Sequence, residues 1–264
     1  MRVDRDELAA RGVTVVRDVA PEALLAPARD AVHAFLGDPV PPVPYGVVPL
    51  HHGQALWDLR QHPPLHAVFA EVFGHERLWV SMDRAIYRAA AGAPESALHW
   101  DVDPRIRGPH RFQGMLFLTD GGDDGAPFEC VPSLYAALPA WLAAHPGLDL
   151  EAPIDLGDHV PETVAARAGD LVLWDVRLPH RGAPNRGGAP RMSFAVTMWE
   201  EGGDDERAER VTCWRDNRIP RSWSGWPGVR DPEPGPAAGL TPLGRRLVGL
   251  DRWAPTGSCR GSSR

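Results

Sequence analysis

The sequence predicts a double-stranded β-helix, or jelly roll, with α-helices packed on its outside. Helical patterns come first along the chain, between Pro21 and Phe73. From Leu78 onward, short apolar segments alternate with clusters of glycine, proline and aspartate, as in sandwiches and barrels of short strands. A length of 264 residues suits one domain with a well-buried core. We therefore expect residues 1–264 to form a single, mainly β domain with flanking helices.

The first part of the chain carries strand and helix signals in turn. Gly12–Arg17 is predicted as a short strand. Pro21–Leu36 has Ala, Leu and Val at helical spacing after an initial proline, which predicts an amphipathic helix. The proline-rich segment Pro39–Pro49 is expected to be irregular. Leu65–Phe73 is predicted as a second helix, closed by Gly74.

The later part of the chain is predicted to be mostly strands. The predicted strands are Leu78–Tyr87, Ala97–Asp101, Phe112–Thr119, Leu171–Trp174 and Arg191–Trp199. A helix is expected over Ser133–His145, although Pro139 should interrupt it. The tail after Pro255 is rich in glycine, serine and arginine, so we expect residues 255–264 to be disordered.

Composition excludes several functional classes. Hydrophobic residues make up 43% of the chain and charged residues 24%, and the formal net charge is −7, so a nucleic-acid or anionic-membrane surface is not expected. All 28 basic residues are arginine, and the sequence contains no lysine. That absence rules out a Schiff-base lysine, a pyridoxal-phosphate anchor and a P-loop lysine.

Three features predict a cytoplasmic protein. The cysteines Cys130, Cys213 and Cys259 are few, odd in number and far apart, as in a reduced intracellular protein. The N-terminal segment Met1–Leu8 is too polar for a signal peptide. No apolar run approaches the ~20 residues that span a bilayer. We expect a monomer or homodimer that acts on a small molecule, without nucleic-acid or membrane partners.

The triplet His99-Trp100-Asp101 has the spacing of a metal-binding pair. On a strand, side chains two residues apart point to the same face, so both groups could reach one ion. Chance alone gives about 1.5 His-x-acid triplets in a chain of this composition. The triplet by itself therefore favours a surface histidine beside an aspartate over a metal site.

His180 and Arg191 lie eleven residues apart and strengthen the prediction. Two histidines and one carboxylate on one face of Fe(II) leave three coordination positions open, as oxygen-activating enzymes require. Arg191 begins a strand whose alternate residues are small or polar, so its guanidinium should face a cavity. Such a charge is costly to bury without an anion; the distal carboxylate of 2-oxoglutarate is one candidate partner, and an internal aspartate is the alternative.

Several segments together resemble a known family in their order and spacing. They are LWVSMDRA from Leu78, HWDVDP from His99, QGMLFLTD from Gln113, Cys130–Pro132, LVLWDVRLPH from Leu171 and RMSF from Arg191. The resemblance is to the phytanoyl-CoA dioxygenase family of Fe(II)/2-oxoglutarate-dependent oxygenases, and it covers most of the chain.

The resemblance implies a ligand set and a reaction. In this family the histidine, aspartate and histidine that match His99, Asp101 and His180 bind Fe(II), and the arginine that matches Arg191 binds the 2-oxoglutarate 5-carboxylate. Such enzymes consume O2 and release succinate and CO2. Related halogenases have a small residue at the position of Asp101, so a carboxylate there favours hydroxylation of an aliphatic carbon; desaturation or ring formation remain open.

Further residues follow from the same resemblance. Phe117 lies where relatives often carry an aromatic residue beside 2-oxoglutarate, and Gln113 shares its strand face. Ser193 is a candidate for a hydrogen bond to the carboxylate that Arg191 holds. The chain departs from the family at two places. Ser133-Leu-Tyr135 stands where the family usually has Gly, then Ser or Thr, then His. Gly182 stands where many relatives have a serine, so one co-substrate hydrogen bond is either missing or supplied elsewhere.

Two other functions are compatible with the motifs. One is a metal-binding jelly roll without oxygenase activity. The other is a zinc hydrolase with Asp103 as general base. The substrate is less defined: a free acid, an amino-acid derivative or a natural-product intermediate all fit. Four arginines near the predicted site are candidates to meet an anionic substrate, namely Arg84, Arg105, Arg107 and Arg111.

Overall fold

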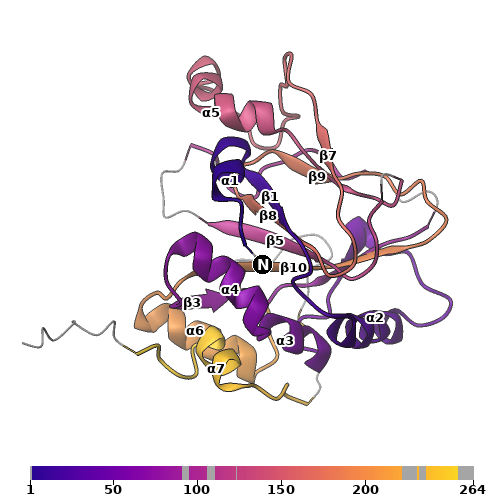
Figure 1. Cartoon of the computed structure of the whole chain (residues 1–264), viewed down its shortest axis with the longest axis vertical. Helices are drawn as coiled ribbons and strands as arrows, with labels where there is room; N and C mark the ends of the chain where they lie inside the picture. The colour runs from indigo at the N-terminus through magenta and orange to yellow at the C-terminus, as the bar shows by residue number, and fades with distance from the viewer. Residues whose placement is uncertain are drawn as a thin grey trace, which may run out of the picture.

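Two antiparallel sheets form the centre of the molecule (Figure 1). The structure is a computed structural model that describes residues 2–90, 95–105, 111–122, 124–221, 231 and 236–254. The strands of the large sheet, in spatial order, are β1 (Val13–Val16), β8 (Leu171–Asp175), β5 (Phe112–Phe117), β10 (Arg191–Glu200), β4 (Ala85–Arg88) and β2 (Val47–Val48), and β3 (Leu78–Val80) also pairs with β10. The small sheet has the order β7 (Glu162–Val164), β6 (Phe128–Cys130) and β9 (His180–Gly182).

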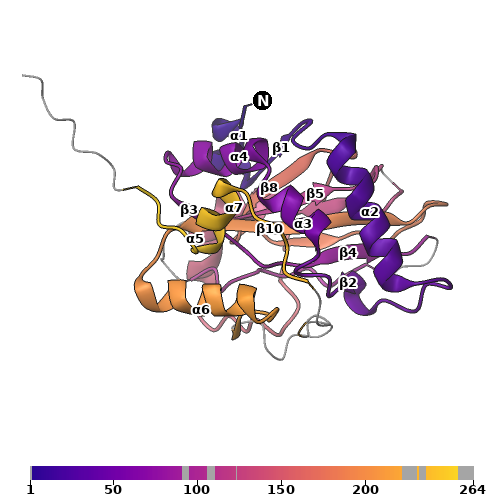
Figure 2. The same ribbon diagram turned by 90° about the horizontal axis from the view of Figure 1, so that it is seen from below.

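Helices cover the outside of this strand core. The small sheet lies on one side of the large sheet, and α3 and α4 lie on the other (Figures 1 and 2). The helices are α1 (Arg5–Arg11), α2 (Glu22–Leu36), the 3-10 turn η1 (Pro44–Gly46), α3 (Gln54–Arg60), α4 (Pro63–Phe73), α5 (Pro132–Ala144), α6 (Asp204–Arg215) and α7 (Pro242–Val248). The predicted jelly roll with flanking helices is confirmed. Within the described residues, no helix is both long and apolar enough to cross a bilayer.

The large sheet is buried on both faces, which explains its continuous apolar strands. In β8, Leu171 and Leu173 pack into the core under the helices. Val172 and Trp174 point the other way, into a second core between the two sheets. This alternation follows from the two-residue period of a strand. All five residues of β8 are buried as a result.

The alternation along β10 separates the core from the interior of the barrel. Met192, Phe194, Val196 and Met198 pack under the helices, as predicted. The other face carries every second residue from Arg191, namely Arg191, Ser193, Ala195 and Thr197. These residues pair in register with β5, which places Ser193 opposite Phe117 and Thr197 opposite Gln113. Small side chains of β10 therefore face the larger Gln113, Met115 and Phe117 of β5 in the interior.

Several predicted elements are confirmed nearly to the residue. Gly12–Arg17 contains β1, and Pro21–Leu36 contains α2. The second predicted helix corresponds to α4, which ends at Gly74 with a φ of 77°. Pro39–Pro49 is irregular apart from η1 and the two-residue β2. The tail 255–264 lies outside the described residues.

Three local predictions were wrong. Leu78–Tyr87 is split into β3 and β4 because the buried guanidinium of Arg60 takes the carbonyls of Ser81 and Asp83, which a continuous ladder would need. Ala97–Asp101 is no strand; it makes a single bridge, between His99 and His180. Pro139 does not interrupt α5, because burial of Leu134, Leu138 and Trp141 outweighs the one hydrogen bond that a proline removes.

Candidate metal and co-substrate site

His180 is positioned by the small sheet. It is the first residue of β9 and pairs with Cys130 of β6. Its ring packs against Phe128, with the ring centroids 5.3 Å apart and nearly parallel, and against Trp174 at 5.0 Å. Only 7% of its side chain is exposed. The imidazole is thus held in one orientation between two aromatic rings.

His99 is brought to His180 by the backbone. The two residues exchange both backbone hydrogen bonds, from His99 N to His180 O at 3.1 Å and from His180 N to His99 O at 3.0 Å. Residues paired in this way sit directly opposite each other across two antiparallel segments. Their rings lie 4.6 Å apart as a result. The side chain of His99 is 47% exposed, so this side of the cluster is open.

Asp101 completes a cluster of three potential ligands. Its carboxylate oxygens lie 3.5 Å from Nε2 of His180 and 3.9 Å from Nε2 of His99. The three ligand atoms all lie within 4.8 Å of one another. Side chains from residues 99, 101 and 180 therefore converge as predicted. They do so without a strand over Ala97–Asp101, because the single bridge to β9 is sufficient.

Hydrogen bonds at Nδ1 leave Nε2 of each histidine available to bind a metal ion. Nδ1 of His180 lies 3.0 Å from Leu178 O, and Nδ1 of His99 lies 2.9 Å from Ala97 O. A carbonyl accepts only from a protonated nitrogen, so Nε2 keeps its lone pair in the neutral ring. Burial lowers the pKa of His180, although Asp101 opposes this shift. The donor set of two neutral imidazoles and one carboxylate fits a divalent iron.

Trp174 supports the carboxylate. Its indole Nε1 donates a hydrogen bond to Oδ2 of Asp101 at 3.2 Å. The same indole ring packs on Phe128 at 4.7 Å and on His180. Trp174 therefore contacts two of the three candidate ligands at once. Trp174 was predicted to lie on a strand, without a role in the site; its place six residues before His180, on the interior face of that strand, was the available signal.

Arg191 is a buried guanidinium without an acidic partner among the described residues. It is 2% exposed, and no described residue accepts a hydrogen bond from its Nε. Nη1 donates to Ser193 Oγ and contacts Met115 Sδ. Burial, with repulsion from Arg88, lowers the pKa of Arg191 to about 9. No aspartate in the described part of the chain pairs with Arg191, in contrast to the alternative considered from the sequence, and the guanidinium fits an anionic co-substrate.

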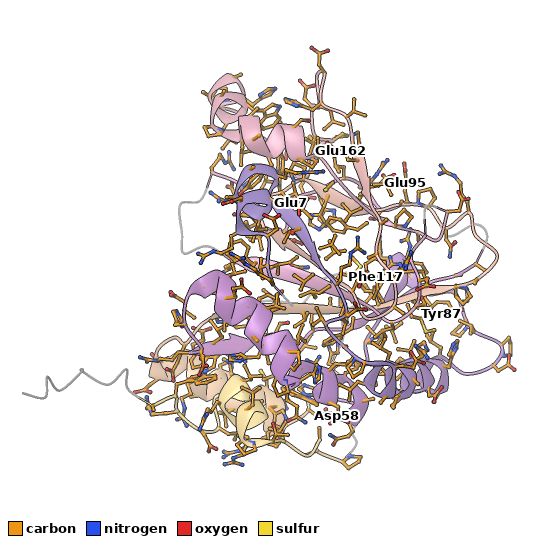
Figure 3. The ribbon with its side chains drawn as sticks, in the orientation of Figure 1. Glu7, Asp58, Tyr87, Glu95, Phe117 and Glu162 are labelled. Carbon is orange, nitrogen blue, oxygen red and sulfur yellow. The ribbon has the colours of Figure 1, made fainter. Side chains whose placement is uncertain are left out.

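Two neighbours of Arg191 match the predicted co-substrate residues. Ser193 accepts the hydrogen bond from Nη1, and the guanidinium carbon lies 5.3 Å from the centre of the Phe117 ring. Figure 3 labels Phe117 among the central strands, and its ring packs in the core between the two sheets. Arg88 pairs directly with Arg191 across β4 and β10, which adds a second positive charge. Gln113 lines a cavity that also contains Asp101.

Gly182 leaves a gap that a hydroxyl from another segment fills. Oγ of Ser96 accepts a hydrogen bond from Gly182 N at 2.8 Å. A Cβ atom at position 182 would lie 3.6 Å from that same oxygen. The serine expected at this position in many relatives is therefore replaced in space by Ser96. At the other departure, Ser133–Tyr135 forms the first turn of α5.

Other candidates are engaged elsewhere. Asp103 forms a two-point ion pair with Arg105, which lowers its pKa. It is therefore a weak base, and the hydrolase alternative loses its general base. Arg84 is paired with Asp83 at 2.7 Å. Arg107 lies outside the described residues.

Comparison with known proteins agrees with this geometry. The family model described as Phytanoyl-CoA dioxygenase (PhyH) matches residues 137–193, which contain His180 and Arg191. The predicted resemblance to the phytanoyl-CoA dioxygenase family is confirmed. No curated protein sequence matches the chain significantly.

Solved structures show the same fold at low sequence identity. GIG2 (DUF1479) from Candida albicans has a TM-score of 0.72 at 13% identity, over 96% of this chain and 78% of that protein. The non-heme alpha ketoglutarate dependent carbocyclase SnoK of nogalamycin biosynthesis has a TM-score of 0.55 at 17% identity, over 78% and 88%. The epimerase SnoN, in complex with Fe3+, alpha ketoglutarate and nogalamycin RO, has a TM-score of 0.54 at 16% identity, over 89% and 93%.

Proposed function

We propose that this chain is an Fe(II)/2-oxoglutarate-dependent dioxygenase that hydroxylates an aliphatic carbon of a small molecule. The observation that carries the proposal is that the interior between the two sheets holds two kinds of group. Nε2 of His99, Nε2 of His180 and the carboxylate of Asp101 lie within 4.8 Å of one another. Arg191 lies on the interior face of β10, buried and without an acidic partner among the described residues. Neither group has an evident structural purpose alone.

Each residue has a distinct task in this proposal. His99, Asp101 and His180 would hold the iron, and their position on one face would leave room for other ligands. Arg191 and Ser193 would bind the distal carboxylate of 2-oxoglutarate by charge-assisted hydrogen bonds. Phe117 packs against that guanidinium and limits access of water to it. Trp174 keeps Asp101 in place.

The bound centre would supply oxygen activation, in which O2 and 2-oxoglutarate give succinate and CO2 and one oxygen atom enters the substrate. SnoN is reported with Fe3+ and alpha ketoglutarate, which supports the same pair for this chain. SnoN is described as an epimerase and SnoK as a carbocyclase. The product therefore distinguishes hydroxylation from its alternatives: hydroxylation adds one oxygen atom, ring closure or desaturation removes two hydrogen atoms, and epimerisation leaves the mass unchanged.

Anaerobic titration with Fe(II) and then 2-oxoglutarate tests the proposal. We expect a weak visible charge-transfer band, followed by slow succinate formation after air is admitted. Asp101→Ala should lose both signals, while Asp103→Asn, two residues away, should keep them. A chain that binds Fe(II) but gives neither band nor succinate would be a non-catalytic metal protein. Zn-dependent hydrolysis without succinate would support the hydrolase instead.

A further inference from the structure

A cavity of about 550 Å³ adjoins the candidate metal site and reaches helix α6. Asp101 and Gln113 form part of its wall near the metal site. Trp199 of β10 and Arg210 of α6 form another part. This volume lies within the range of small-molecule sites. Because the cavity contains a candidate iron ligand, a molecule bound in it would lie beside the reacting centre.

Arg210 is the unusual residue of this cavity wall. It is only 6% exposed, although it belongs to a largely polar helix. Its guanidinium lies between two indole rings, 5.1 Å from the centre of Trp79 and 4.8 Å from that of Trp199. Nη2 donates to Val80 O at 2.6 Å and to Leu247 O at 2.9 Å. The side chain is therefore fixed in position by aromatic stacking and two carbonyls.

The remaining donors of Arg210 are unused. Within the described part of the chain, no residue accepts a hydrogen bond from its Nε or Nη1, and of these two nitrogens only Nε is fully enclosed. Arg210 lines the cavity, and Nη1 is its one unbonded nitrogen that is not fully enclosed. Buried Arg60 shows the contrast: its Nε, Nη1 and Nη2 donate to the carbonyls of Ser81, His51 and Asp83 in turn. All three guanidinium nitrogens of Arg60 therefore have acceptors, whereas among the described residues only one of the three in Arg210 does.

The charges around Arg210 leave room for an anion. None of the ion pairs between described residues within 4 Å includes Arg210. The charge of Glu206 raises the pKa of Arg210, but this glutamate is exposed and accepts a hydrogen bond from Trp199 Nε1 at 2.9 Å. Of the three further arginines of the wall, Arg84 is paired with Asp83, and Arg111 and Arg221 are exposed. Burial of an unpaired guanidinium is costly, and a ligand carboxylate in the cavity would offset that cost.

We propose that the primary substrate is an organic carboxylate, whose carboxylate accepts a hydrogen bond from Nη1 of Arg210 while its carbon skeleton extends through the cavity toward Asp101. One buried donor without an acidic partner suits the one charge of a carboxylate better than the two charges of a phosphate monoester, because the other arginines of the wall are paired or exposed. Arg210 would then be a specificity-determining residue. The proposal rests on the proposed function, because it takes the neighbouring cluster to be the reacting centre.

Binding to the metal-free protein tests this proposal without any turnover. The probes are alkyl and arylalkyl carboxylates that fit the cavity, each matched with its primary amide, and their affinities are measured by isothermal titration calorimetry. At least one carboxylate should bind more tightly than its amide by about 10–150-fold, the value of a charge-assisted hydrogen bond. Arg210→Gln should bring this ratio close to one. Arg246→Gln is the matched control, because Arg246 stacks on Trp253 but is exposed and outside the cavity wall.

A second measurement needs no variant. Crystals of the wild-type protein soaked with the tightest carboxylate should place a carboxylate oxygen within hydrogen-bond distance of Nη1 of Arg210. The proposal is overturned if no carboxylate is preferred over its amide, if Arg210→Gln keeps the preference, or if the probe binds elsewhere. Carboxylate binding through Arg210 in a protein that forms no succinate would instead contradict the proposed function alone.

Discussion

Replacing Arg191 with methionine should make the ligand-free protein more stable while removing its response to 2-oxoglutarate. The reason is that Arg191 is enclosed, lacks an acidic partner among the described residues and faces the positive Arg88 across two strands. Methionine is close in length and adds no charge. A residue retained for structure would give the opposite sign, so the direction of the change is informative.

The magnitude follows from the environment of the side chain. Burial lowers the pKa of Arg191 from 12.5 to about 9, and each tenfold change in proton affinity corresponds to ~1.4 kcal/mol. Burial of the charge, with repulsion from Arg88, therefore costs on the order of 5 kcal/mol, and at pH 7 the cost is complete because both pKa values lie above that pH. Loss of the Ser193 hydrogen bond and of the contact with Phe117 destabilises the variant by about 3 kcal/mol, which offsets part of this gain. The expected net gain in the free energy of unfolding is about 2 kcal/mol.

Thermal unfolding with and without 2-oxoglutarate measures both effects. For a chain of this size, about 2 kcal/mol corresponds to a rise of roughly 4–8 °C in Tm. Saturating 2-oxoglutarate, with a divalent metal present, should raise the Tm of the wild type and leave that of Arg191→Met nearly unchanged, because a ligand stabilises only the state that binds it.

Arg60→Met is the matched control for this experiment. Arg60 is equally buried, and burial also lowers its pKa to about 9. Its loss would leave three backbone carbonyls without their donor, at about 1–3 kcal/mol each, so this variant should be less stable than the wild type. The reasoning is refuted if Arg191→Met is destabilised like Arg60→Met, or if it keeps the full Tm response to 2-oxoglutarate.

Three further predictions concern the site and its surroundings. Trp174→Phe should weaken Fe(II) binding by about 10–100-fold in an anaerobic titration, because it removes the hydrogen bond to Asp101; unchanged affinity would show that the indole only fills space. Asp101→Ala should abolish 2-oxoglutarate-dependent succinate formation, and full turnover would remove Asp101 from the ligand set. Burial lowers the pKa values of His51 and His52 from 6.5 to about 4. As the pH falls, these histidines are therefore protonated in the unfolded chain before they are protonated in the folded one. Urea unfolding should therefore show stability falling between pH 6.5 and pH 4, by up to about 3 kcal/mol per histidine, and a flat profile there would contradict this.

The jelly roll and the central residues of the site were predictable because their signals are local. The alternation of Arg191, Ser193 and Thr197 with apolar neighbours determined which face of β10 lies inside. The spacing of His99 and Asp101 with the later His180 predicted the cluster. These signals rest on strand periodicity and on ligand chemistry, and both are read from a few adjacent residues.

The features that escaped prediction depend on contacts between distant segments. The break between β3 and β4 is caused by Arg60, which lies on helix α3. The supporting hydroxyl at Gly182 comes from Ser96, on a different segment. Helix α6 has a polar sequence, so nothing in it indicated that Arg210 would be buried between Trp79 and Trp199. Tertiary packing of this kind overrides local preference.

The most direct test of the account is the position of the iron itself. Crystals grown without oxygen in the presence of Fe(II) and 2-oxoglutarate should show one anomalous peak at the iron absorption edge. We predict that this peak lies within bonding distance of Nε2 of His99, Nε2 of His180 and a carboxylate oxygen of Asp101, with the distal carboxylate of 2-oxoglutarate against Arg191. A peak at any other place, or 2-oxoglutarate bound away from Arg191, would contradict the account.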